Sequence, residues 1–141
     1  MEITFQSEGV KPPQLEEKKL SEWIETIATS HNKKVGEISY LFCDDNKILE
    51  VNKQFLNHDF YTDIITFDYS TRDTISGDII ISVETVKSNS KMYKTTFMEE
   101  LHRVIIHGIL HLSGLNDLTE EDEKLMRIAE NNALKLIPYS I

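Results

Sequence analysis

Apolar positions recur along the chain with two different spacings, and these spacings predict its helices and strands. Apolar residues three or four positions apart predict a helix over residues 15–30, packed by one face with Trp23 as a core anchor. Alternation of apolar and polar residues predicts short strands at residues 3–5 and 38–42. Residues 79–81 are consecutive isoleucines, so we expect their strand to be covered on both faces.

The remaining pattern adds two strands and four helices. Residues 64–69 and 77–82 are rich in β-branched residues, and the polar stretch between them predicts an antiparallel hairpin. Polar residues that can act as N-caps precede helical spacings, which predict helices over about residues 46–55, 84–93, 97–112 and 120–136. We therefore expect an α+β fold in which a small four-stranded sheet, mixed or mostly antiparallel, packs against about five helices. One domain is expected to span residues 1–141.

Composition restricts the class of protein. The chain has 141 residues, of which 40% are hydrophobic and 28% charged, as is typical of a soluble globular domain. Cys43 is the one cysteine, so no intramolecular disulfide can form, and we expect a small core residue and a cytoplasmic, reducing compartment. Neither a signal peptide nor an apolar run of about 18 residues is evident, so no membrane partner is expected. The net charge of -9 disfavours broad attraction to nucleic acid but does not exclude a local basic groove.

The chemistry is concentrated in residues 107–117, which read HGILHLSGLND. His107 and His111 are four residues apart, a spacing that places both rings on one face of a helix, where they can share a metal ion. Gly114 fits a helix C-terminus, after which the chain can turn back and bring Asp117 round as a third ligand. Two imidazoles and a carboxylate suit zinc, and nickel, cobalt and iron accept the same donors. The alternative is two partly buried helix histidines beside an unrelated aspartate.

Gly108 argues against one class of metalloenzyme. The pattern is similar to the HExxHxxGxxH motif of metalloproteases, in which a glutamate follows the first histidine and acts as general base. Here that position is Gly108, which cannot accept a proton from a metal-bound water. A metallopeptidase is therefore the least favoured function.

Three stretches together resemble the YbeY family of bacterial endoribonucleases, which mature ribosomal RNA. The first is the HGILHLSGLND stretch, and the second joins Asn52 to residues 56–67, which end in TDIITF. The third is the GDIIIS strand at residues 77–82. The resemblance extends from about residue 35 to residue 136.

The chain departs from the family pattern at two positions. The family usually has a third histidine where this chain has Asp117, and the neighbouring Asn116 is a second choice as ligand. The family often has an RNA-binding arginine at the position that aligns with Leu56, which cannot hold a phosphate. Arg103, one helical turn before His107, is the substitute that we expect to bind substrate. A snorkelling surface arginine is the equally weighted alternative.

The resemblance implies a single-strand-specific, metal-dependent endoribonuclease that acts in rRNA maturation and in ribosome assembly or quality control. It implies one zinc ion, or another divalent transition metal, held by His107, His111 and Asp117. The implied partners are RNA, the small ribosomal subunit and its assembly factors, and no DNA partner is expected. Attack by a metal-held water and attack by the 2′-hydroxyl both stay open. No catalytic acid or base is assigned, although Asp63, Asp78 and Glu84 are candidates.

A ribosome-assembly binding factor with a structural metal is the main alternative. The missing arginine and the net acidity of the chain favour it modestly. Removal of the metal distinguishes the two functions, because a structural metal stabilises the fold directly.

Overall fold

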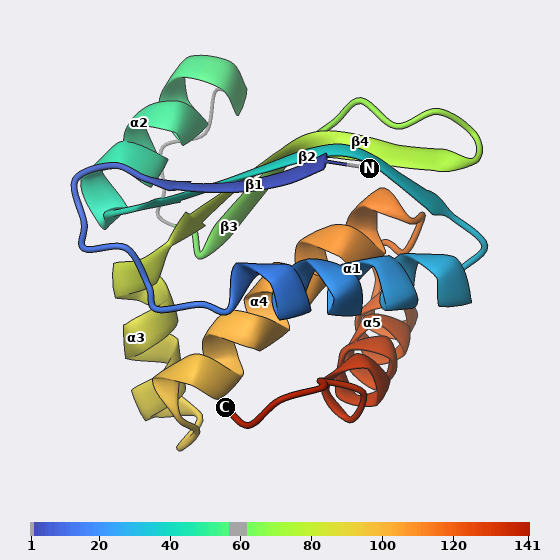
Figure 1. Cartoon of the computed structure of the whole chain (residues 1–141). Coiled ribbons are helices and arrows are strands. Elements are labelled where there is room, and N and C mark those ends of the chain that lie inside the picture. The colour runs from blue at the N-terminus through green and yellow to red at the C-terminus, as the bar shows by residue number, and fades with distance from the viewer. Residues whose placement is uncertain (1, 57–61) are drawn as a thin grey trace.

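The computed structural model describes residues 2–56 and 62–141, in which one four-stranded sheet packs against five helices (Figure 1). The strands are β1 (Glu2–Ser7), β2 (Lys34–Cys43), β3 (Ile64–Asp68) and β4 (Thr74–Ser82). The helices are α1 (Glu17–Ser30), α2 (Asp45–Leu56), α3 (Val83–Met92), α4 (Phe97–Leu112) and α5 (Glu120–Leu134). The predicted α+β class is confirmed. No helix in the described residues is long and apolar enough to cross a membrane.

The sheet is mixed, with the strand order β1-β2-β4-β3. β1 pairs with β2 and β2 pairs with β4 in parallel, while β3 runs antiparallel to β4. The predicted hairpin is therefore confirmed, with Ile64 opposite Ile81 and Asp68 opposite Gly77. β4 begins at Thr74, three residues before the expected start, because residues ahead of Gly77 continue the pairing with β2.

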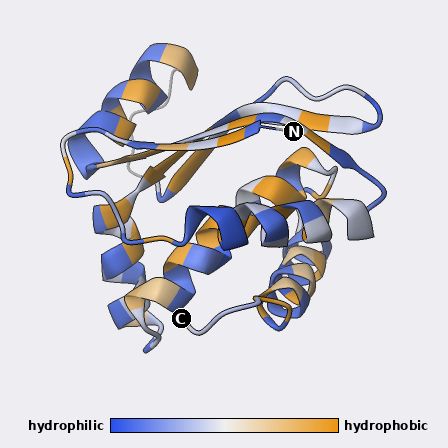
Figure 2. Cartoon of the chain, viewed as in Figure 1, coloured by the Kyte–Doolittle hydropathy of each residue, from blue (hydrophilic) through white to orange (hydrophobic). Residues whose placement is uncertain are grey.

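The helices lie in two layers on opposite faces of the sheet. In Figure 1, α2 covers one face, and α1, α3, α4 and α5 lie on the other. Ile79 and Ile81 belong to the large core beneath α1 and α4, whereas Ile80 packs with Ile48 and Val51 of α2 in a smaller core. The three consecutive isoleucines are thus covered on both faces, as predicted. Figure 2 shows hydrophobic residues on the strands and on α4, where the layers meet.

Local sequence signals explain where α4 begins and ends. The Thr96 hydroxyl accepts a hydrogen bond from the backbone N–H of Glu99, as an N-cap does. At the other end Gly114 has a φ of 110°, and the N–H of Leu115 bonds to the carbonyl of Leu110. This is the glycine-terminated turn expected from the sequence. It reverses the chain just after α4 ends at Leu112 and leads to Asp117.

Gly108 sets how closely α4 approaches the sheet. A Cβ atom at this position would lie 2.9 Å from Ile79 Cδ1 and 3.3 Å from Ile64 Cδ1. Position 108 therefore faces β3 and β4, and a glutamate there would enter the core. The absence of a side chain at Gly108, which argues against a metalloprotease, therefore also allows α4 to pack closely against β3 and β4.

Two further residues occupy the core positions predicted for them. Trp23 is 1% exposed and donates a hydrogen bond from Nε1 to the carbonyl of Ala133, which joins α1 to the end of α5. Cys43 is fully buried, and burial raises the pKa of its thiol to about 12. A thiol with such a pKa is protonated at neutral pH and a poor nucleophile.

Candidate active site

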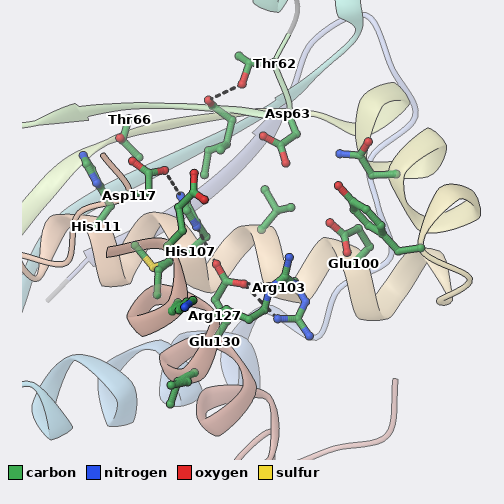
Figure 3. Close-up of a pocket in the computed structure, with 18 of the residues that line it drawn as sticks. Thr62, Asp63, Thr66, Glu100, Arg103, His107, His111, Asp117, Arg127 and Glu130 are labelled. Carbon is green, nitrogen blue, oxygen red and sulfur yellow. Dashed lines mark hydrogen bonds and ion pairs between the residues drawn. The ribbon is translucent and has the colours of Figure 1, made fainter. Parts of the chain in front are cut away.

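A cavity of about 1080 Å³ opens between the β3 end of the sheet and helices α3, α4 and α5. His107, His111, Asp117 and Arg103, the four residues predicted for the site, all line it (Figure 3). The turn after Gly114 brings Asp117 back beside α4. The structure therefore collects the predicted residues in one place, although Asn116 is not part of the lining.

His107 is held between two carboxylates. Its Nδ1 lies 2.8 Å from Oε2 of Glu130, and its Nε2 lies 3.6 Å from Oδ2 of Asp117. Both nitrogens of the ring therefore face negative charge. Burial lowers the pKa of His107, but the hydrogen bond and charge of Glu130, together with the charges of Asp117 and Asp63, outweigh it and leave the pKa raised.

The close approach of His107 Nε2 to the Asp117 carboxylate is stabilised only when a positive charge lies on the ring or between the two groups. An ionised carboxylate only accepts hydrogen bonds, so the Glu130 contact places the proton of a neutral ring on Nδ1. Nε2 and Asp117 Oδ2 then face one another with lone pairs only, and either a second proton or a metal ion satisfies both. One nitrogen and one carboxylate oxygen are donors that zinc accepts, so these residues fit the metal that the resemblance implies.

The full ligand set is less defined than this pair. His111 is on the same stripe of α4 and lines the same cavity. Within residues 2–56 and 62–141, no three His, Cys, Asp or Glu side chains converge closely enough to enclose a metal ion. His107, His111 and Asp117 as joint ligands therefore stay a prediction.

Arg103 is paired inside the cavity. Its Nη1 lies 3.0 Å from Oε1 of Glu130, and its side chain is only 17% exposed. This placement differs from a snorkelling surface arginine, although the guanidinium still lines the cavity. Arg127 is more exposed and lies 3.9 Å from the same Glu130 oxygen.

Glu130 is the site residue that the sequence analysis missed. It lies on the buried stripe of α5, between Met126 and Ala133, where a carboxylate needs a partner. Burial raises the pKa of Glu130, but the hydrogen bonds from His107 and Arg103 and the charge of Arg127 outweigh it, so the pKa is lowered. The one signal in the sequence was an acidic residue on an apolar stripe.

The three acidic candidates from the sequence lie in different places. Asp63 lines the cavity, and burial raises its pKa. Asp78 accepts a hydrogen bond from the Tyr69 hydroxyl at 3.3 Å, and Glu84 accepts one from the backbone N–H of Asp45 at 2.8 Å. Neither of these two lines the cavity.

Glu100 is a second residue that the sequence analysis missed. It is 5% exposed, lines the cavity, and has a pKa raised by burial.

The described lining of the cavity carries more negative than positive side chains. The carboxylates are those of Asp63, Glu100, Asp117, Glu120, Glu123 and Glu130. The permanent cations are those of Arg103, Lys124 and Arg127. A polyanion that enters this cavity would meet repulsion unless a further cation is bound there.

Leu56, the second departure from the family pattern, ends α2 and is 39% exposed. It does not line the cavity. Residues 57–61 of the same signature lie outside the described residues.

Comparison with known proteins decides the family. The family model described as endoribonuclease YbeY matches residues 2–137. The chain belongs to the endoribonuclease YbeY family. A curated endoribonuclease YbeY of Bacteroides fragilis is 54% identical over 136 residues, which cover 96% of this chain and 98% of that protein. Another, of Phocaeicola vulgatus, is 55% identical over 135 residues and covers the same shares.

The fold has a solved relative as well. The solution structure of a Thermotoga maritima protein matches 94% of this chain and 87% of its own, with a TM-score of 0.67 and 28% sequence identity. Family membership confirms the prediction of an endoribonuclease, which is a hydrolase acting on RNA phosphodiester bonds. YbeY endoribonucleases are generally metal-dependent.

Proposed function

We propose that this chain is a single-strand-specific endoribonuclease that uses one zinc ion, or a similar divalent metal, in the maturation of ribosomal RNA. His107, His111 and Asp117 are the proposed ligands. The observation that carries the proposal is the pair formed by His107 Nε2 and Asp117 Oδ2, which face one another at 3.6 Å at the wall of a cavity. Membership of the endoribonuclease family supports RNA as the substrate.

The residues of the cavity have separate roles in this proposal. Bound to the ligands, the metal would supply positive charge for a phosphate oxygen and lower the pKa of a water molecule. Arg103 lies one turn before His107 and adds a fixed positive charge to the same wall. Asp63 lines the cavity with a raised pKa, which makes it a better proton acceptor near neutral pH than an ordinary aspartate.

The wider setting also belongs to the proposal. We expect the enzyme to act in the cytoplasm on ribosomal RNA, in contact with the small ribosomal subunit and its assembly factors. A role in the maturation of ribosomal RNA fits the endoribonuclease family. We further propose that residues 1–141 act as a single domain.

The test combines metal analysis with RNA cleavage. Wild type, His111→Ala and the control His31→Ala are purified, loaded with zinc, and assayed for bound metal and for cleavage of a single-stranded RNA. His31 follows the end of α1 and lies outside the cavity. We expect near-stoichiometric zinc and RNA cleavage in wild type and His31→Ala, and loss of both in folded His111→Ala.

Two results would contradict the proposal. Zinc bound without RNA turnover in any form would favour an assembly factor with a structural metal. A wild-type protein that takes up no divalent metal, even after zinc is added, would remove the proposed ligand set.

A further inference from the structure

Glu130 joins α5 to α4 through both of its carboxylate oxygens. Oε2 accepts a hydrogen bond from Nδ1 of His107 at 2.8 Å, and Oε1 accepts one from the Arg103 guanidinium at 3.0 Å (Figure 3). The residue is 6% exposed. Arg103 and His107 are one helical turn apart on α4, so a single carboxylate on the facing helix reaches both.

The pairing decides which nitrogen of His107 faces the cavity unprotonated. Oε1 faces two guanidinium groups, Arg103 at 3.0 Å and Arg127 at 3.9 Å, which are always charged and can only donate, so the Glu130 carboxylate is held as an anion that can only accept. The neutral His107 ring therefore carries its proton on Nδ1 and its lone pair on Nε2, the nitrogen on the Asp117 side. The opposite tautomer would present an N–H to that side and could not bind a metal there.

Arg103 fixes the carboxylate in this orientation. It occupies Oε1, which leaves Oε2 for His107, and its positive charge offsets the cost of burying an anion. Arg103 and His107, both at the cavity wall, thus contact the same more deeply buried carboxylate, that of Glu130 on the facing helix.

We infer that Glu130 is a positioning residue, which holds the His107 ring in the tautomer and orientation that metal binding at Nε2 requires. The inference rests on the proposed function in so far as His107 is a metal ligand. A histidine ligand commonly donates its other ring N–H to a carboxylate, and loss of that partner costs about 10–100-fold in metal affinity.

The alternative is a purely structural ion pair that pins α5 to α4. Such a pair would affect unfolding but not the tautomer of His107 or the metal affinity of folded protein. Glu130→Gln separates the two, because it keeps the shape of the side chain. Its amide must either direct an N–H group at Arg103, which is itself a donor, or direct one at Nδ1 of His107 and so favour the opposite tautomer.

The experiment compares Glu130→Gln with Glu123→Gln. Glu123 lies on the same helix and lines the same cavity, and its substitution removes the same charge from an exposed position. Long-range ¹H–¹⁵N NMR of metal-free protein, at a pH where the ring is neutral, reports the His107 tautomer. Competition with a zinc chelator reports affinity, and urea unfolding reports stability.

We expect the Nδ1–H tautomer in wild type and Glu123→Gln, and a mixed or inverted tautomer in Glu130→Gln. Zinc affinity should fall about 10–100-fold in Glu130→Gln and less than about threefold in Glu123→Gln. If Glu130→Gln does not fold, Glu130→Asp replaces it. The shorter aspartate keeps the negative charge but moves the carboxylate away from Nδ1 of His107. The loss of zinc affinity in Glu130→Asp must then exceed the loss in Glu123→Asp.

An unchanged tautomer and unchanged zinc affinity in Glu130→Gln would overturn the inference and leave a structural ion pair, whatever the urea midpoint shows. The two proposals fail separately. A wild type that binds no zinc contradicts the proposed function, whereas the tautomer comparison on metal-free protein still decides whether Glu130 orients the ring.

Discussion

Two histidines on α4 lie five residues apart and have opposite environments. His102 is fully buried, with Nδ1 2.7 Å from the carbonyl of Met98 and Nε2 2.8 Å from the Tyr139 hydroxyl. His107 is partly exposed at a cavity and lies between the carboxylates of Glu130 and Asp117. Burial lowers the pKa of His102, although its Met98 hydrogen bond opposes this, whereas the neighbouring acids raise the pKa of His107.

The comparison shows that the charge of the hydrogen-bonding partners, more than burial, distinguishes the core histidine from the histidine at the cavity. A carbonyl only accepts hydrogen bonds, so His102 donates from Nδ1 and accepts the Tyr139 hydroxyl proton at Nε2. All its hydrogen-bonding capacity is used by uncharged groups. The His107 ring has the same preferred tautomer, but its Nε2 faces an anion at a cavity and is available for a cation.

The largest effects are expected when one of the two imidazole rings is removed by substitution with alanine, first at His107. We expect His107→Ala to lower the cleavage rate of a single-stranded RNA by more than about 100-fold, because it removes a proposed ligand and not merely a residue that orients one. The measurement is the rate at saturating zinc, with circular dichroism as a check on folding. Cleavage within about threefold of wild type would place the chemistry elsewhere.

The same substitution at His102 should lower the stability of the fold and leave metal binding unchanged. His102→Ala opens a cavity beside Trp23 and leaves the Tyr139 hydroxyl without its acceptor, so we expect a loss of about 2–4 kcal/mol in the free energy of unfolding. Urea denaturation measures this loss. Zinc affinity of the folded fraction should stay at the wild-type value, and a large drop would show that the two histidines are not separate.

The two histidines should also give stability opposite dependences on pH. His102 has a lowered pKa in the folded state, so the unfolded chain binds more protons and stability falls as pH drops below about 6.5. His107 has a raised pKa, so its contribution is present below about 6.5 and is lost as pH rises through its folded-state value. Urea midpoints of chelator-treated wild type, His102→Phe and His107→Gln between about pH 5 and 8 give each slope by difference. If the contributions of His102 and His107 to stability changed with pH in the same direction, the opposite environments proposed for the two rings would be refuted.

The smallest expected effect is that of Tyr139→Phe. It removes the hydroxyl that donates to His102 Nε2 and leaves the ring packing in place, so we expect a loss of about 0.5–1.5 kcal/mol in unfolding free energy. Urea denaturation measures it, with wild-type RNA cleavage as the control. A loss as large as that of His102→Ala would mean that the C-terminal residues around Tyr139 contribute more than this single hydrogen bond.

Interactions between residues close together in the sequence were enough to predict much of the fold and the candidate metal ligands. Thr96 and Gly114 mark the ends of α4 because capping depends on neighbouring residues. The spacing of His107 and His111 likewise depends only on helix geometry.

Features that depend on how helices and strands distant in the sequence pack together could not be predicted in the same way. The contact between Glu130 and His107 requires α5 to pack against α4, and 23 positions separate the two residues in the sequence. The choice between a mixed and a mostly antiparallel sheet stayed open because alternation shows which face of a strand is buried but not which strand is its neighbour. The parallel pairing of β1, β2 and β4 therefore emerged only from the structure.

The strand order also has a consequence for the rate of folding. Glu2 pairs with Glu37, and Lys34 pairs with Thr74, so each parallel pairing closes a long stretch of chain before it gains any contacts. Loop closure of this kind slows folding, whereas the β3–β4 hairpin and the neighbouring helices α4 and α5 close over short distances. We therefore expect assembly of the parallel strands, and not the docking that joins Glu130 to His107, to limit how fast the chain folds.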